Sequence, residues 1–497
     1  MESPDIGTTT PNNPQYLWMG GPKQRGTFGI ISFCLSTLII CIWSTLHFNI
    51  PTRRHTPTRR FSLQVFWMFI ALLAPELLLF LAINERINAH TMLKKVLKFH
   101  PYLEKPGMLA SVNDRISGQA KLRRVSTQCQ PPAIHQLIVA EQQHYGPIEQ
   151  TPQLHFGLVH AFYGIMGGFA FYGPYGHNNP NAEDSLFQIS TNPNITVEVP
   201  RFETLIYIME HFPHILTDIT EEYIRDQAAS SGLSKAILIV QVAWFCTNCV
   251  SRLFQGLPLS LLEVSTAAHA FCTLLTYFVW WSKPMNVAAP TLMREKGAQE
   301  LYALLKCTDL EYDEAWGVAM GRTAEGATGP HASAKIVLAA NALRRTPTPG
   351  RPPSQDRFKE PDSSLVPGNF GNRSSNEEFS VGISMAISPI FYGLVHFLAW
   401  GDNFPTPLER LLWRVSSFMV TSSGLVAVSG AVALTRFTAL DESRSNLILG
   451  TVVVFGIPAA YMLASGFLIV ESFRQLLFLD PAAYQLPSWS NYWPHLS

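Results

Sequence analysis

The stretch TVVVFGIPAAYMLASGFLIV, residues 451–470, decides the fold class, because it contains no charged side chain over its whole length. An apolar helix of about 20 residues is long enough to cross the ~30 Å hydrocarbon core of a bilayer. Runs of this kind recur along the chain. The sequence therefore predicts an all-α, multi-pass transmembrane helical bundle of about eight spans, at residues 27–48, 61–83, 156–175, 235–256, 259–281, 379–400, 411–435 and 447–470.

The overall composition agrees with a membrane environment. Hydrophobic residues make up 47% of the 497-residue chain and charged residues only 14%, against roughly 25% charged in a typical chain. The formal net charge is zero, so no global field favours nucleic acid as a partner, and we expect the lipid bilayer instead. The seven cysteines are irregularly spaced. Because Cys246 and Cys249 lie in an apolar run without a second pair, we interpret them as helix packing and not as a metal or redox site.

The segments between the spans differ in character. The four arginines of residues 51–60 favour the cytoplasmic side of the membrane. Residues 343–377 are rich in Pro, Ser and charge, so we expect them to be disordered, and Asn194 and Asn372 begin sequons that would be glycosylated only on the other side. The predicted organisation is a polar tail at 1–26, a transmembrane hairpin at 27–84, a basic loop at 85–155, central spans at 156–281 with a loop at 176–234, an amphipathic then disordered loop at 282–378, C-terminal spans at 379–479 and an interfacial tail at 480–497.

Residues 71–82, ALLAPELLLFLA, place one carboxylate, Glu76, among apolar residues. An ionisable side chain at membrane depth costs about 2.5–3.5 kcal/mol on insertion scales, so it is a functional candidate. Pro75 removes a backbone donor and should kink the helix there. Apolar surroundings disfavour the charged form, so Glu76 would keep its proton and could donate it. A structural hydrogen bond to a neighbouring helix, or to a carbonyl freed by the kink, explains the sequence equally well.

The densest group of polar residues lies in WFCTNCVSRLFQGLPLSLLEVSTAAHAF, residues 244–271. Arg252 and Gln255 lie one helical turn apart, just before a Gly-Leu-Pro break, and Glu263 and His269 follow it. A buried Glu263–Arg252 ion pair across the break would need no chemistry, and His269 would then be an ordinary helix-contact histidine. The alternative is that Glu263 donates a proton and His269 assists it.

Two further histidines lie in aromatic segments that share the tetrapeptide Gly-Leu-Val-His, which ends at His160 and at His396. Acid groups and aromatic walls inside a lipid-facing bundle favour a site for an apolar substrate, and ring faces stabilise positive charge by cation–π attraction. Many of these rings would equally serve as packing or interface residues. The aromatic candidates are Tyr163, Trp280, Trp281 and Tyr392.

Five motifs together resemble a family of fungal multi-pass membrane proteins: CIWSTLHFNIP (41–51), the helix with Pro75 and Glu76, LVHAFYGIMGGF (158–169), QGLPLSLLEVSTAAHAF (255–271) and YFVWWSKPMNVAAP (277–290). The characterised members of that group are the membrane-bound terpene cyclases of the ascofuranone and macrophorin meroterpenoid pathways. The resemblance covers nearly the whole chain, apart from the tails and the stretch expected to be disordered.

The resemblance implies a concrete chemistry. The substrate would be a farnesyl chain on a phenolic or epoxycyclohexenone head group, and the protein would be an integral protein of the endoplasmic reticulum membrane. One branch of the chemistry opens a terminal epoxide, and another protonates a terminal olefin. Both need a desolvated acid, an aromatic-walled cavity and a base for the final proton. No metal and no redox cofactor is required.

Under this hypothesis Glu76 is the predicted proton donor and Glu263 the second choice, while His160 or His269 orients the acid or takes the final proton. Two other classes stay open: a transporter or channel-like protein with a buried proton relay, and a non-enzymatic scaffold in the membrane. No inverted hydropathy repeat is visible, which argues against a transporter. The predicted substrate-binding residues are Tyr163, Arg252, Gln255, Trp280, Trp281, Tyr392 and His396.

Overall fold

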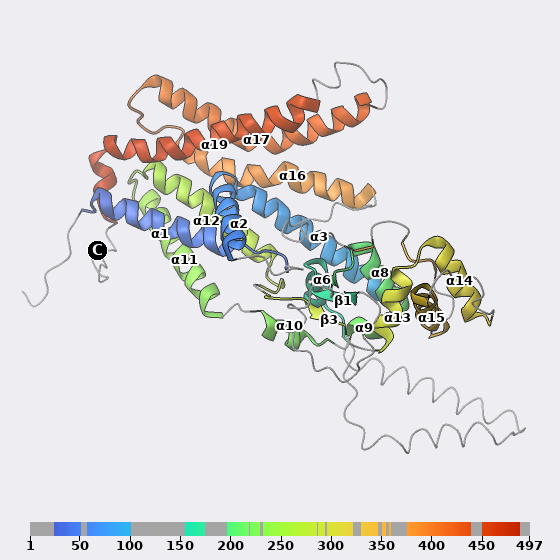
Figure 1. Cartoon of the computed structure of the whole chain (residues 1–497). Helices are drawn as coiled ribbons and strands as arrows, with labels where there is room; N and C mark the ends of the chain where they lie inside the picture. The colour runs from blue at the N-terminus through green and yellow to red at the C-terminus, as the bar shows by residue number, and fades with distance from the viewer. Residues whose placement is uncertain are drawn as a thin grey trace, which may run out of the picture.

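A computed structural model gives the fold of the chain (Figure 1). It describes residues 24–50, 57–100, 155–173, 196–217, 219–228, 232–285, 287–293, 296–321, 330–345, 350–353, 357–358, 375–438 and 450–487. Both sequons, most of the predicted basic loop and most of residues 343–377 lie outside the described residues, so the predictions made for them stay predictions.

The protein is an all-α multi-pass membrane bundle, as the hydropathy predicts. Six described helices are long and apolar enough to cross a bilayer, or seven when one bent pair is included. Four of these six spans are single α-helices. The span Glu378–Ala399 joins an α-helix to a short 3-10 turn, and Val452–Phe478 combines a π-helical turn, an α-helix and a 3-10 turn. These elements are α1 (Thr27–Thr45), α11 (Gly232–Phe254), α12 (Leu261–Val279), α16 (Ser375–His396), α17 (Pro407–Thr438), η4 (Val452–Gly456), α19 (Ile457–Arg474) and η5 (Gln475–Phe478).

The predicted span at 61–83 is a sharply bent pair of helices. The direction of the chain bends by 106° between helix α2 (Pro57–Leu73) and helix α3 (Pro75–Phe99). The break falls where Pro75, which has no N–H, starts the second helix. Helix α3 continues through residues 85–99, which the sequence analysis had assigned to a loop, because its buried face extends from Glu76 to Val96.

The predicted span at 156–175 is wrong. The chain there forms the short helix α6 (Leu158–Ile165) and the strand β1 (Phe169–Gly173). Gly167 takes a positive φ of 90°, which ends the helix, and Gly168 packs directly under the Tyr163 ring. The segment is apolar because it is buried within protein, and burial in a core and burial in lipid leave the same hydropathy signal.

Strand β1 is the centre of a small sheet outside the apolar bundle. It pairs antiparallel with β2 (Thr196–Glu198) and parallel with β3 (Thr291–Leu292). Short helices surround this sheet at the far end of α3, and α13–α15 form a group at its side (Figure 1). They are α8 (Phe202–His211), α9 (His214–Thr217), α10 (Glu221–Gln227), α13 (Lys296–Leu305), α14 (Asp309–Ala319) and α15 (Pro330–Arg345); the remaining short turns are η3 (Phe397–Ala399) and η6 (Pro481–Tyr484).

Helices α16 and α17 pack closely through glycine. Pro389 inside α16 has no N–H, so the carbonyl oxygen of Met385 lacks its usual partner within the helix. Gly424 of α17 lies against this point: a Cβ atom at Gly424 would be 2.2 Å from the Met385 oxygen. Small residues let membrane helices approach in this way.

We expect Gly424→Ala to destabilise the bundle by about 1–3 kcal/mol, because the two helices must move apart to fit the methyl group. The midpoint of thermal unfolding in detergent measures this. The matched control is Gly382→Ala on α16, where an added Cβ would meet nothing within 4 Å. Equal midpoints for the two variants would contradict the proposed close packing.

Candidate functional site

The break between α2 and α3 leaves two backbone carbonyls at the centre of the bundle without helical partners. Nε2 of His269 lies 2.8 Å from the Leu72 oxygen. The Leu73 oxygen accepts hydrogen bonds from the Ser465 hydroxyl at 2.5 Å and the Tyr461 hydroxyl at 3.1 Å. Side chains of α12 and α19 therefore converge on the kink, as buried backbone groups need partners.

Glu76 lies in the first turn of α3, directly beside these groups. It is only 4% exposed. Its Oε2 atom makes no hydrogen bond within the described part of the chain. The Tyr461 hydroxyl lies against the carboxyl group, and Cys272 and Tyr392 surround it from α12 and α16. The carbonyls freed by the kink are thus bonded to other side chains, and Glu76 keeps one oxygen unpaired.

Tyr392 and His396 extend this cluster along α16. Nδ1 of His396 lies 3.1 Å from the Tyr392 carbonyl oxygen, so Nδ1 carries the hydrogen and Nε2 has a free lone pair. That Nε2 atom and the Tyr392 hydroxyl are both buried without a hydrogen bond among the described residues. The Tyr392 ring contacts both histidine rings, with centroid distances of 4.8 Å to His396 and 5.2 Å to His269.

His269 differs from His396 because both of its nitrogens face backbone carbonyls. Nδ1 lies 2.9 Å from the Ser265 oxygen and Nε2 lies 2.8 Å from the Leu72 oxygen. Carbonyl oxygens only accept, so the nitrogen that carries the hydrogen donates to one of them, and the other nitrogen faces the second carbonyl and not a ligand. His269 therefore orients the kink and packs on Tyr392, and His396 is the histidine with base character.

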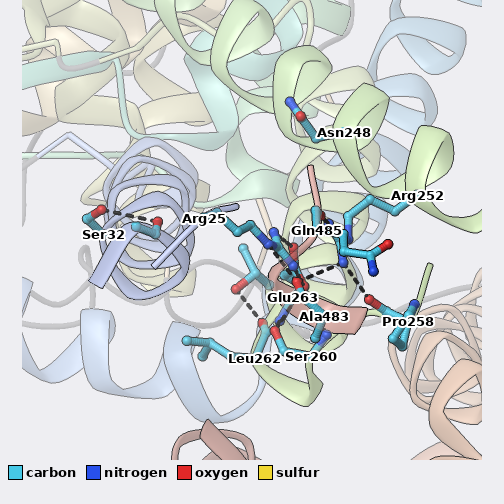
Figure 2. A network of polar contacts seen from close by, with 12 residues as sticks. Arg25, Ser32, Asn248, Arg252, Pro258, Ser260, Leu262, Glu263, Ala483 and Gln485 are labelled. Atoms are coloured by element: carbon cyan, nitrogen blue, oxygen red, sulfur yellow. Dashed lines mark hydrogen bonds and ion pairs between the residues drawn. The ribbon is translucent and has the colours of Figure 1, made fainter. Parts of the chain in front are cut away.

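Glu263 belongs to a separate polar network (Figure 2). Its carboxylate forms a bidentate ion pair with Arg25, in which Nη2 lies 2.9 Å from Oε2. The same carboxylate accepts bonds from the backbone and hydroxyl of Ser260 at 2.9 and 3.0 Å, which makes a capping box at the start of α12. Every oxygen of Glu263 is therefore occupied.

Arg252 does not pair directly with Glu263, although the sequence analysis considered that ion pair. Its guanidinium instead donates to the carbonyl oxygens of Gln485, Pro258 and Ala483, at 2.6, 2.8 and 2.9 Å (Figure 2). These bonds fasten η6 and the residue that follows it to the turn between α11 and α12. Gln255, which directly follows the last residue of α11, is exposed.

His160 and Tyr163 lie on α6, outside the apolar bundle. His160 accepts a bond from Gly157 N–H at Nδ1, and its Nε2 lies 2.8 Å from the Ile219 oxygen. Burial lowers the pKa of His160 below its usual 6.5, which favours the neutral ring that this arrangement requires. The Tyr163 hydroxyl bonds to Thr291 at 2.7 Å. Tyr163 thus ties α6 to β3, and His160 ties α6 to the segment just before α10.

The two tryptophans predicted to line the site lie in different environments. Trp281 is 66% exposed. Trp280 is buried, but its ring packs against Lys283 and His47 beyond the end of α12. Among the described residues, no group of three His, Cys, Asp or Glu side chains could hold a metal ion.

Sequence reasoning missed several members of these clusters. Tyr461 and Ser465 carry no charge, so a search for ionisable residues inside spans passes over them. Arg25 was assigned to the polar tail. Glu85 and Lys283, which form a buried ion pair, lie just outside predicted spans, where an acid and a base are a usable signal.

The comparisons with known proteins place the chain in a family. The model of a family of unknown function, DUF8562, matches residues 4–318 and 380–496. The chain belongs to this family. The DUF8562 match includes every residue of both polar clusters and omits α15. No curated protein and no solved structure matches the chain.

Proposed function

We propose that this DUF8562 protein is a membrane-bound enzyme that cyclises a prenyl chain, with Glu76 as the acid that starts the reaction. The observation that carries the proposal is the buried Glu76 oxygen without a hydrogen bond, beside two further unpaired groups, the Tyr392 hydroxyl and His396 Nε2. Buried polar groups are otherwise paired almost everywhere in proteins. Three such groups in one place favour a site that bonds to something else during its function.

The proposed reaction begins with proton transfer from the Glu76 carboxyl group to a terminal olefin or epoxide of the substrate. The O–H bond of the acid breaks, a C–H or O–H bond forms, and the next double bond attacks the resulting cation to close a ring. Loss of a proton from the last cation to His396 Nε2 ends the sequence. Tyr392, between the two, can return that proton to Glu76, so the reaction is an isomerisation without net proton uptake.

The other predicted site residues take different parts in this proposal. The Tyr392 ring can stabilise the cation, and His269 positions the helix break that holds Glu76. Glu263 and Arg252 serve the fold, because the Glu263 carboxylate pairs with Arg25 and both Nη atoms of Arg252 bond to backbone carbonyls. We also propose the endoplasmic reticulum as the membrane that the protein occupies.

One observation favours a second candidate, proton conduction. Glu76, Tyr392 and His396 form a row of buried titratable groups that joins α3 to α16, which is an arrangement typical of relays in transporters. Such a protein would move protons across a membrane without changing a substrate.

Membranes from a host that expresses the full chain test the two functions. The substrate is a phenol with a linear farnesyl chain, supplied also as its terminal epoxide, in D₂O buffer. A cyclase gives a ring product of the same composition; olefin protonation adds one non-exchangeable deuterium, and epoxide opening adds none. Proteoliposomes with an internal pH dye report conduction. Proton flux without a ring product would overturn the proposal in favour of the relay.

A further inference from the structure

A second buried polar cluster lies farther along α3, where α1 and α12 end. The ammonium group of Lys283 lies 2.6 Å from Oε2 of Glu85, and these side chains are 0% and 1% exposed. The same ammonium lies 4.2 Å from the centre of the Trp280 ring and 3.3 Å from the His47 carbonyl oxygen. A fully buried ion pair of this kind is costly to desolvate, so it calls for an explanation.

Two atoms of this cluster lack hydrogen bonds among the described residues. Oε1 of Glu85 is a buried acceptor, and Nε1–H of Trp280 is a buried donor. Both belong to residues in contact with Lys283. An unpaired acceptor and an unpaired donor beside one ion pair indicate a ligand group that can both donate and accept a hydrogen bond.

Charge balance narrows the chemistry of that ligand. Lys283 and Glu85 already neutralise each other, so a charged ligand would leave a net charge buried, which proteins avoid. A neutral hydroxyl group satisfies both unpaired atoms: its hydrogen goes to Glu85 Oε1, and its oxygen accepts from Trp280 Nε1. A ketone or an ether could only accept.

The cluster shares helix α3 with the first site but lies apart from it. Glu85 follows Glu76 by nine residues on α3, a rise of about 13.5 Å at 1.5 Å per residue. Helix α1 ends at Thr45 and α12 ends at Val279, so the cluster lies at the boundary of the apolar bundle. Nine residues at about 100° each also place Glu85 and Glu76 on opposite faces of α3. The two sites are therefore separate, and an amphipathic molecule with its hydroxyl here would place its hydrocarbon chain against the apolar bundle.

We propose that Glu85 and Trp280, held by Lys283, bind the hydroxyl of the substrate head group. The assignment of this hydroxyl to the substrate rests on the proposed cyclase function, and the hydroxyl site itself does not. A membrane sterol carries the same hydroxyl chemistry, and the experiment separates the two sources.

The binding experiment uses the full chain in nanodiscs and isothermal titration calorimetry. The probe is a phenol with a fully saturated farnesyl chain, which cannot be protonated at an olefin. Its methyl ether, which has no hydrogen for Glu85, is the matched ligand and should bind at least tenfold more weakly. Changing the ligand tests Glu85 without replacing it, because Glu85→Gln would leave Lys283 buried without its counter-charge.

The protein variant is Trp280→Phe, which keeps the ring against Lys283 and removes only the N–H group. We expect its affinity for the phenol to fall about five- to tenfold, since one hydrogen bond is lost. Trp43→Phe on α1 is the control, because Trp43 is largely exposed, and it should bind like the wild type. Gel filtration and unfolding midpoints confirm that both variants fold.

Each result of these binding measurements either supports or overturns the proposal. Equal binding of phenol and ether, no binding of either the phenol or a sterol by folded protein, or an unchanged Trp280→Phe variant overturns the hydroxyl site. A sterol that binds with the same Trp280 dependence, while the phenol does not, overturns the assignment to substrate. If the saturated phenol binds as expected but the unsaturated one yields no ring, the hydroxyl site stands and the cyclase proposal fails.

Discussion

Glu76→Gln abolishes the cyclised product, with an expected fall of at least about 100-fold in product per folded protein, since general acid catalysis contributes at least that much. The amide has nearly the shape of the carboxyl group but offers no acidic proton. Product formation from the farnesyl phenol, measured by mass spectrometry and normalised to folded protein, checks this. Glu76→Asp keeps the acid and should retain more activity than Glu76→Gln.

The fold should tolerate Glu76→Gln, because Oε2 of Glu76 has no hydrogen bond to lose among the described residues. The control is Glu222→Gln on α10, an exposed acid, which should change neither product nor stability. Full activity of folded Glu76→Gln protein would remove Glu76 from the mechanism and return it to a structural role.

The long apolar runs and the break at Pro75 were open to prediction because each depends on local sequence alone. Hydropathy over twenty residues marks a span such as α12, and a proline inside an apolar run marks the kink that exposes Leu72 and Leu73 carbonyls. The segment at 156–175 misled the same method, because a helix and a strand buried in protein need apolar side chains as much as a membrane span does.

The partners of the polar residues could not be predicted from local sequence. Glu263 pairs with Arg25, 238 positions away, and the kink is bonded by Tyr461 and Ser465 from the last membrane helix. Packing of distant helices decides such contacts, and no spacing rule contains them. The tetrapeptide at His160 and His396 shows the same limit, since one copy folds outside the bundle and the other at its centre.

Arg25→Met should destabilise the bundle by about 3–5 kcal/mol, because it leaves the Glu263 carboxylate buried without its cation. Thermal unfolding in detergent measures this loss. The control is Arg225→Met, which breaks the Arg225–Glu221 pair on the exposed side of α10 and should cost about 0–1 kcal/mol. The double variant Arg25→Met with Glu263→Gln should recover part of the loss, since no unpaired charge remains buried.

Activity in these variants separates the two candidate acids. Glu263→Gln should lower stability, because it weakens the pair with Arg25 and the cap at Ser260, but each folded molecule should cyclise at the wild-type rate. Glu76→Gln should do the reverse. A folded Glu263→Gln protein of normal stability that makes no product would identify Glu263 as the donor. If the carboxylate were purely structural, its loss would lower stability before it lowered activity.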